Sequence, residues 1–406
     1  MSKRLFAIVS VLVLASFILA ACGPSTPAYT CTDKIGCVTI KPGEPVHIAY
    51  GLVVAGPNET LGIDSRNGIE IAIADAGGKI LGHDIKFDGQ DTGCSAETGQ
   101  AAATKLAADP TIIGVVGTSC SSEARVGMPL MSKAGFVVVS PSNTAVDLTE
   151  AGNANNYPGY LRTAHNDKVQ GAKAAEYAYN VLGIRKAATI NDGSIYADGL
   201  QKVFAENFKK LGGTITAQSA VDPNQTDMSS VLADIAAGSP ELIYLPIFQP
   251  AGPFIILQAP KTPGLETVKL MGADGLFSPD VVTAAGDSIE GFKVSSPLVT
   301  GAAYDAFVQK YTTKFGKAPI SIFHAHAYDA FNMIKAGIEK VAVQQADGTL
   351  IIPRQALRDA LYATKDFQGL TGVLGCTPTG DCANPVIGIY EYHKGQYPPT
   401  LIFPTQ

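Results

Sequence analysis

The sequence lacks any run of basic residues and contains few charged residues of either sign. Only 16% of its 406 residues are charged, and the formal net charge is −6 at pH 7. An acidic chain without a basic patch gives no support for a nucleic-acid partner. Beyond its N-terminal segment, the chain also lacks a run of about 20 apolar residues, the length that a membrane-spanning helix requires.

The sequence has only six histidines, which limits the chemistry it can perform. The segment 112–124, IIGVVGTSCSSEA, places Ser119 and Ser121 after an apolar strand, where a nucleophile would stand. It lacks the Gly-x-Ser-x-Gly pattern, and no histidine base occupies a suitable strand-end loop. His324 and His326 are two positions apart, so they do not share a helix face for a metal ion. We therefore expect no enzyme activity, no metal and no cofactor.

The N-terminus has the features of an export signal. Lys3 and Arg4 precede an apolar segment, which ends in LAAC at residues 19–22. This ending resembles a bacterial lipobox, which implies cleavage before Cys22 and a lipid on its sulfur. We expect a signal peptide at 1–21 and a lipidated tether with a small disulfide loop at 22–45, anchored to the outer face of the cell membrane or in the periplasm. An ordinary signal peptide or an uncleaved anchor is the alternative.

Six cysteines remain after Cys22. An even number in an exported chain indicates disulfides. Their spacing favours two short loops and leaves one longer one: Cys31–Cys37, Cys376–Cys382 and Cys94–Cys120. A metal site is the competing interpretation, but the cysteines have neither close Cys-x-x-Cys spacing nor histidine partners.

Apolar strands alternate with helical patterns along most of the chain. VHIAYGLVV (46–54) reads as a strand and is followed by a helical pattern that ends at Gly77 and Gly78. This alternation predicts an α/β fold with parallel sheets covered by helices on both faces. We expect two doubly wound lobes, an N-lobe of 46–162 plus 297–368 and a C-lobe of 163–296 plus 369–406. Three crossover strands near Arg162, Lys293 and Gly369 would join them.

The loops at the strand ends are small, polar or glycine-rich, and ligands bind beyond the carboxyl ends of parallel strands. A helix that begins near Ser121 would offer free N–H groups and a positive dipole end to a carboxylate. Ser142 and Thr144 follow the next strand, and Asp274 in MGADG would meet an ammonium group from the opposite lobe. Helix caps and an ordinary turn aspartate are the alternatives.

Several of these segments together resemble the branched-chain amino acid-binding proteins of ABC importers, which are type I periplasmic binding proteins. The resemblance covers Val46 to Tyr392 and rests on the lipobox, on DTGCSAETGQAAATKLAADPTIIGVVGTSCSS, and on SPSNTAVDLT, NDGSIYADGL and MGADG. It implies a disulfide between Cys94 and Cys120, in agreement with the spacing.

The resemblance also implies roles for individual residues. Ser121, Ser142 and Thr144 would bind the ligand carboxylate. Ser142 stands where the family usually has Ala or Gly and would donate its backbone N–H. It would also lie near the ammonium group of the ligand. Asp274 stands where the family commonly has Glu, the ammonium partner. The remaining expected pocket and closure residues are Tyr196, Leu61, Phe248 and Phe323.

The implied protein is an extracytoplasmic solute-binding lipoprotein that binds an aliphatic amino acid, as a monomer, and delivers it to an ABC permease. Two alternatives remain open. The same fold would accept an amide, a urea or an aromatic acid, or it would serve a sensory or surface protein. A serine hydrolase is the least favoured interpretation.

Overall fold

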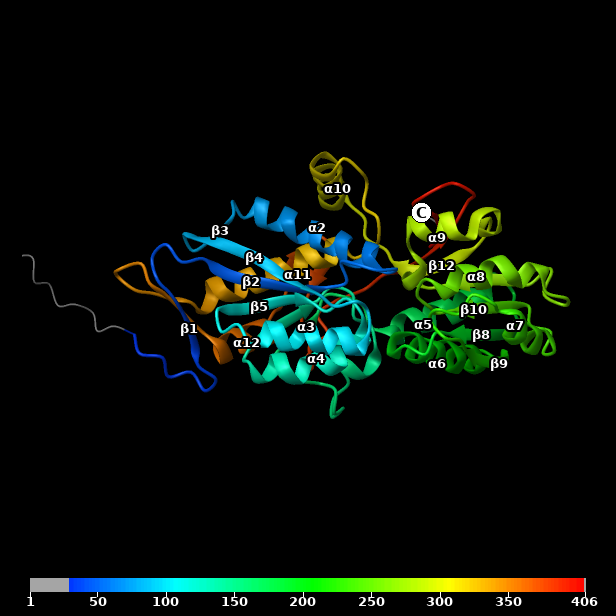
Figure 1. Ribbon diagram of the computed structural model, residues 1–406, viewed down its shortest axis with the longest axis horizontal. Coiled ribbons are helices and arrows are strands. Elements are labelled where there is room, and N and C mark those ends of the chain that lie inside the picture. The colour runs from blue at the N-terminus through cyan, green and yellow to red at the C-terminus, as the bar shows by residue number, and fades with distance from the viewer. Residues whose placement is uncertain (1–28, 405–406) are drawn as a thin grey trace, which may run out of the picture.

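The computed structural model describes residues 29–404, which form two α/β lobes arranged along the longest axis of the molecule (Figure 1). The expected signal peptide, the lipidation site Cys22 and the start of the tether lie outside the described residues. Within the described part, no helix is long and apolar enough to cross a membrane.

The N-lobe is built on a six-stranded sheet that is parallel except at one edge. Its strand order is β3-β4-β2-β5-β6-β7, and only the β3–β4 pair is antiparallel. Every residue of β5 and β6 is buried, as expected for central strands covered on both faces. The strands are β2 (Val46–Leu52), β3 (Lys79–Ile80), β4 (His83–Asp91), β5 (Ile112–Gly117), β6 (Val137–Ser140) and β7 (Tyr160–Arg162).

Helices cover both faces of this sheet and create two apolar cores. The helices are α2 (Glu59–Asp75), α3 (Ala96–Ala107), α4 (Ser121–Lys133), α10 (Ala302–Phe315), α11 (His324–Val341) and α12 (Arg354–Tyr362). The helices α2 and α11 approach each other closely at Gly68, where a Cβ would lie 2.1 Å from the carbonyl oxygen of His324. A glycine is therefore required at this contact.

The C-lobe is a seven-stranded sheet of order β18-β17-β12-β11-β10-β8-β9, in which the two strands from the end of the chain are antiparallel to their neighbours. Its strands are β8 (Lys186–Asn191), β9 (Thr214–Ala220), β10 (Leu242–Leu245), β11 (Lys269–Gly272), β12 (Lys293–Pro297), β17 (Ile387–Glu391) and β18 (Thr400–Phe403). The helices that cover it are α5 (Asp167–Glu176), α6 (Ile195–Lys210), α7 (Ser229–Ala236), α8 (Ala251–Gln258) and α9 (Pro279–Ala285), and α5 continues as a π-helical turn, η2 (Tyr177–Val181).

The predicted α/β architecture is confirmed, but two segment boundaries in the structure differ from the predicted ones. The tether was expected to reach residue 45, whereas β1 (Cys37–Ile40) already belongs to the N-lobe. This strand pairs with β14 (Leu350–Pro353), which also pairs with β13 (Val343–Gln344). Val38 and Ile40 are buried in the N-lobe core, and their burial holds this strand on the lobe.

The third crossover also comes later than the expected position near Gly369. The segment after it forms a separate two-stranded sheet, β15 (Phe367–Gly369) and β16 (Gly372–Leu374), and Leu374 and Cys382 pack in the N-lobe core. The backbone N–H of Cys382 donates to Arg162 O at 3.1 Å, and Arg162 Nε lies 2.5 Å from Asp381 Oδ1. These contacts keep the segment on the N-lobe until the chain enters β17.

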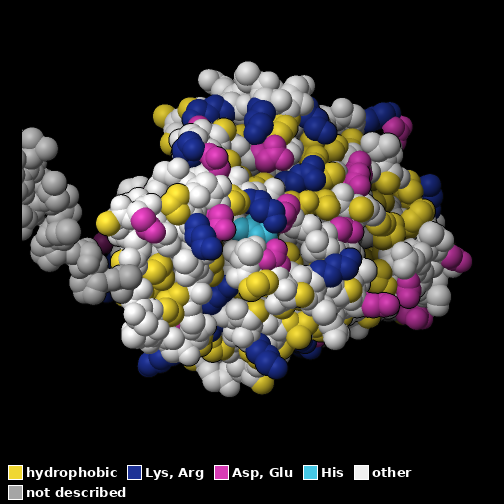
Figure 2. All heavy atoms as spheres, turned by 60° about the vertical axis from the view of Figure 1, so that its left-hand side comes forward, with side chains coloured by type: hydrophobic (Ala, Val, Ile, Leu, Met, Phe, Trp, Pro, Cys, Tyr) yellow, Lys and Arg dark blue, Asp and Glu magenta, His cyan; other side chains and the backbone are white. Residues whose placement is uncertain are grey.

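All three predicted disulfides are present: Cys31–Cys37, Cys94–Cys120 and Cys376–Cys382. The surface of the N-lobe end has basic and acidic side chains interspersed (Figure 2), in line with the absence of basic runs in the sequence.

Candidate functional site

A cavity lies between the two lobes, beyond the carboxyl ends of their parallel strands. The space that a water-sized sphere can enter is about 20 Å³, room for roughly one water, so the lobes are closed on one another in this structure. Seven of the eight residues that the sequence analysis placed at the ligand line it: Leu61, Ser121, Ser142, Tyr196, Phe248, Asp274 and Phe323. The structure therefore brings together side chains that are separated by more than half of the chain.

The N-lobe wall of the cavity is the junction of β5 and α4. Ser121 is the first residue of α4, so the free N–H groups of the first helical turn point beyond it. The Ser121 hydroxyl accepts a hydrogen bond from Ala145 N at 3.2 Å, which ties this turn to the loop after β6. At Gly117 the chain has φ = +152°, and a Cβ there would lie 2.3 Å from a carbonyl oxygen of β2. The approach to α4 thus depends on glycine.

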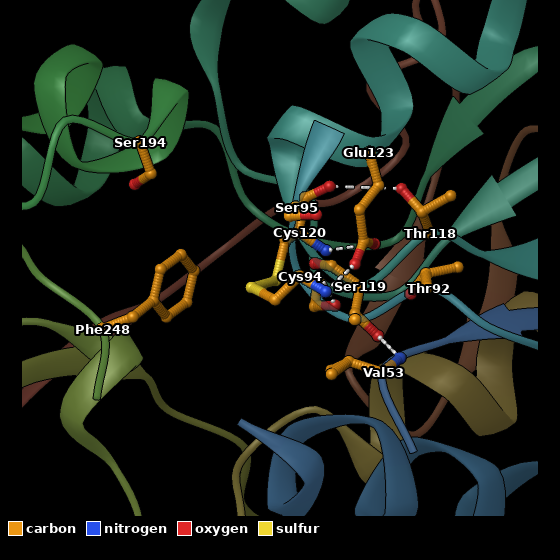
Figure 3. The surroundings of a disulfide bond; sticks show 12 residues. Val53, Thr92, Cys94, Ser95, Thr118, Ser119, Cys120, Glu123, Ser194 and Phe248 are labelled. Carbon is orange, nitrogen blue, oxygen red and sulfur yellow. Dashed lines mark hydrogen bonds between the residues drawn. A yellow bond between two sulfur atoms is a disulfide. The ribbon is translucent and has the colours of Figure 1, made fainter. Parts of the chain in front are cut away.

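The Cys94–Cys120 disulfide and Glu123 hold this junction in place (Figure 3). The Glu123 carboxylate is fully buried and accepts N–H groups from both cysteines, at 2.7 Å from Cys94 N and 2.9 Å from Cys120 N. Burial raises the pKa of Glu123 to about 7, although these hydrogen bonds oppose the rise. The figure also shows Phe248 extending from the C-lobe toward the disulfide, across the cleft.

The loop after β6 contributes Ser142, but its hydroxyl does not face the ligand space. Ser142 Oγ donates to Ser119 O at 2.9 Å, and Ser142 N donates weakly to Ser140 Oγ at 3.3 Å. The Ser142 hydroxyl therefore links the loop after β6 to the loop after β5.

Thr144 is the one predicted residue that does not line the cavity. It is 1% exposed, and its hydroxyl has no hydrogen-bond partner among the described residues. Its carbonyl oxygen accepts a hydrogen bond from Asp167 N, the first residue of α5, at 2.9 Å. The start of α5 thus packs against the Thr144 loop, behind the cavity.

The C-lobe wall centres on Asp274, which follows β11. Asp274 is 6% exposed, and its Oδ1 accepts hydrogen bonds from Gln170 Nε2 at 2.6 Å and from the Tyr196 hydroxyl at 3.0 Å. Its second oxygen, Oδ2, has no such partner within residues 29–404. Burial and the neighbouring Asp274 raise the pKa of Tyr196 well above its usual value, so its hydroxyl is a donor.

Gln170 was not foreseen from the sequence. Its amide donates to Asp274 and to Ser295 O at 3.0 Å, and its carbonyl oxygen lies 2.5 Å from His165 Nε2. Because α5 is separated from Asp274 by about 100 positions, only the tertiary fold reveals this contact. Gln170 thus acts behind the cavity wall. The polar and aromatic residues that line the cavity and that the sequence analysis missed are Asn58, Thr60, Gln249, Phe277, Ser278 and Ser321.

Contacts between the lobes surround the cavity. The Thr60 and Ser278 hydroxyls lie 3.4 Å apart, one on α2 and the other at the N-cap of α9. On the C-lobe side of the cavity, the Phe248 and Tyr196 rings pack against each other with centroids 4.8 Å apart. Both lobes thus contact one enclosed space, and a molecule held there would touch the two lobes at once.

The residues considered for other chemistry have structural partners. Ser119 Oγ accepts from Val53 N at 3.0 Å, and Cys120 is bonded to Cys94. The sulfurs of this disulfide lie within 4.8 Å of a Glu123 oxygen, but oxidised cysteines offer no thiolate to a metal ion. His324 Nδ1 lies 2.7 Å from Asp64 Oδ2.

The fold and the interlobe cavity define a two-lobed solute-binding protein. The model of the periplasmic binding protein family matches residues 45–390, and the chain belongs to this family. A curated relative is the Leu/Ile/Val-binding protein BraC3 of Rhizobium johnstonii, which is 26% identical over 372 residues, 89% of this chain and 96% of that protein.

Solved structures share the same fold. The leucine-binding protein LivK of Thermotoga maritima aligns with a TM-score of 0.78 and 22% identity, over 88% of this chain and 97% of that one. The branched-chain amino acid transporter substrate-binding protein LivJ of Streptococcus pneumoniae, solved with isoleucine, aligns with a TM-score of 0.76 and 22% identity, over 88% of this chain and 99% of that one.

Proposed function

We propose that this chain binds an α-amino acid with an aliphatic side chain between its lobes and delivers it to an ABC permease. One observation carries the proposal. Ser121 at the first turn of α4 and Asp274 line the same cavity from opposite lobes. An amino acid is a zwitterion. Ser121 and the start of α4 suit its carboxylate, and Asp274 suits its ammonium group.

The carboxylate would bind at the N-lobe wall. The first turn of α4 offers free backbone N–H groups and the positive end of the helix dipole, both of which favour an anion. The Ser121 hydroxyl, whose oxygen accepts the Ala145 N–H, retains its own proton to donate. Thr144 has a second hydroxyl without a close partner behind this wall, where it does not line the cavity.

The ammonium group would bind Asp274. Oδ1 of this carboxylate is already held by Gln170 and Tyr196, and this positioning leaves Oδ2 available for the ligand. A buried ion pair of this kind typically loses 2–5 kcal/mol or more when one partner is truncated. An aromatic acid, amide or urea has no ammonium group to neutralise this acid, so Asp274 favours the amino acid over these alternatives.

The ligand side chain would pack against Leu61, Phe248 and Phe323, which line the cavity. Relatives named for leucine, isoleucine and valine indicate the aliphatic class. A ligand that touches both lobes stabilises the closed form over the open one, and the closed form would dock on the permease.

Calorimetry of the purified protein with leucine, isoleucine and valine tests this proposal. Asp274→Asn should weaken binding at least about 30-fold, the equivalent of 2 kcal/mol, whereas Asp274→Glu should preserve it within about tenfold. Asp234→Asn, on the exposed side of α7, is the matched control. The proposal is wrong if the protein binds none of the three amino acids, or if Asp274→Asn binds them as well as the control does.

We also propose that Cys22 carries a lipid that anchors the protein to the outer face of the cell membrane. The LAAC sequence at 19–22 supports this assignment. Mass spectrometry of the N-terminal peptide should show an acylated Cys22, and Cys22→Ala should release the protein from the membrane fraction. An unmodified cysteine at this position in membrane-bound protein would contradict the assignment.

A further inference from the structure

A second cavity lies beside the ligand cleft, between α10 and the C-terminal segment. It encloses about 1240 Å³ when its open mouth is included, and it shares Phe277 and Ser321 with the first cavity. Figure 1 shows α10 at the upper edge of the N-lobe, across from α9 and the C-terminal segment drawn in red. Neither Ser121 nor Asp274 lines this space, so it is separate from the site described above.

The walls of this second cavity are aromatic and come from both lobes. On the C-lobe side, Tyr390 and Tyr397 pack edge-on against Phe277, with ring centroids 5.2 and 6.0 Å away. On the N-lobe side, Tyr304 and Val308 of α10 face this group. Aromatic walls of this kind suit a flat ring, because offset and edge-on contacts between rings are favourable.

A buried chain of hydrogen bonds ends in this cavity. Asp64 is 0% exposed and accepts from His324 Nδ1 at 2.7 Å, and His324 Nε2 lies 2.9 Å from the Tyr304 hydroxyl. Asp64 occupies Nδ1, and Nε2 therefore shares one hydrogen bond with the Tyr304 hydroxyl, whichever of the two atoms donates. The oxygen of Tyr304 therefore keeps its capacity to accept a hydrogen bond from a group in the cavity.

Tyr397 adds an unsatisfied group to the same cavity. Its hydroxyl is buried and has no hydrogen-bond partner among residues 29–404. Burial and the nearby Tyr392, Asp64 and Tyr304 raise its pKa well above the usual value, so it remains protonated. A buried hydroxyl without a partner costs free energy, and a ligand hydroxyl would recover it after a small movement of the Tyr397 side chain toward the cavity.

The charge of the cavity is negative. Asp305 lines it and is exposed, and no lysine or arginine lines it. Asp305 also has no ion-pair partner within the described part of the chain. This charge favours a cation at the mouth, and the tyrosine rings reinforce the preference through cation–π attraction.

We propose that this cavity is a second ligand site for a small phenolic amine. The ring of the ligand packs among the tyrosines, and its hydroxyl contacts Tyr304 and Tyr397. Its ammonium group pairs with Asp305. Its walls come from both lobes, so the site is complete only when the lobes are closed. A ligand of the main cleft therefore preserves or strengthens binding at the second site.

Tyramine is the probe for this site, titrated into the purified protein by calorimetry with and without saturating leucine. We expect binding that is undiminished by leucine. 4-Hydroxyphenylacetate, which replaces the amine by a carboxylate, should bind at least tenfold more weakly, and phenethylamine, which lacks the hydroxyl, about fivefold more weakly. No tyramine binding, a loss of binding when leucine is present, or equal affinity for the anion would each overturn the proposal.

Two variants locate the bound probe. Val308→Trp fills the cavity from α10 and should weaken tyramine binding at least tenfold, with leucine binding changed less than twofold. Asp305→Asn, an exposed change that leaves the packing intact, should weaken tyramine three- to tenfold and leave the binding of phenol unchanged. Tyramine affinity that is unaffected by both variants would show that the probe binds elsewhere, and this would refute the assignment.

Discussion

Replacing Asp167 by Asn should remove a large part of the pH dependence of stability. Asp167 is 0% exposed, and its carboxylate oxygens have no close hydrogen-bond partner among residues 29–404, the Thr144 hydroxyl being a weak donor to them at most. Burial is the main cause that raises its pKa, from 3.8 to about 8, and the negative charge of Asp274 adds to it. Thr144 and Arg162 lower the pKa, and Asp147 raises it slightly.

The direction in which stability changes with pH follows from the pKa values of Asp167 in the unfolded and folded chain. In the unfolded chain Asp167 loses its proton near pH 4, whereas in the folded chain it holds the proton to about pH 8. The folded state therefore binds more protons between these values, and stability falls as the pH rises through this window. A rise of the pKa from 3.8 to about 8 corresponds to at most about 6 kcal/mol, and relaxation of the site reduces this to roughly 2–5 kcal/mol.

Urea unfolding followed by circular dichroism at pH 4, 7 and 9 measures the effect. Asp167→Asn should match the unchanged protein at pH 4 and exceed it in free energy of unfolding by roughly 2–5 kcal/mol at pH 9. Glu123, whose pKa is also raised, is present in both proteins, so its contribution cancels in the difference. A difference between the two proteins that does not change with pH would refute the reasoning, and Asp234→Asn is the control.

Two further predictions concern the walls of the cleft. Replacing both Cys94 and Cys120 by Ala opens a loop with a sequence separation of 26, and it should lower the free energy of unfolding by about 3–4 kcal/mol in urea titrations. The midpoint of the variant should respond less to reductant than that of the unchanged protein, because only the two short-loop disulfides remain. Tyr196→Phe removes a hydrogen bond to Asp274, and it should weaken amino-acid binding about 10-fold in calorimetry, because bonds to charged groups contribute about 1.5–3 kcal/mol. An unchanged unfolding midpoint, or an unchanged affinity, would contradict the respective prediction.

The sequence predicted the elements whose patterns are local. Apolar strands such as β5 and β6, and the loops that follow them, were foreseen because buried parallel strands read as continuous apolar runs. Ser121 and Asp274 could be placed on facing loops for the same reason. Whether they act on a ligand remains a prediction, which the variants above test.

Features that depend on distant contacts were not predictable. The strand β1 has only four residues, and its pairing with β14 joins segments more than 300 positions apart. The crossover after Cys382 depends on contacts with Arg162, and no local pattern near Gly369 indicates them. Gln170 and Asp167 lie behind the cleft because α5 packs there, so a glutamine and a helix-start aspartate gave no signal of their own in the sequence.

A cycle of two ligands and two proteins tests the central claim that Asp274 pairs with the ammonium group of an amino acid. Leucine and 4-methylpentanoate, which lacks the amino group, would be titrated by calorimetry into the unchanged protein and into Asp274→Asn. The account predicts that the unchanged protein prefers leucine by at least about 30-fold and that this preference drops at least tenfold in Asp274→Asn. An equal preference in both proteins would contradict it.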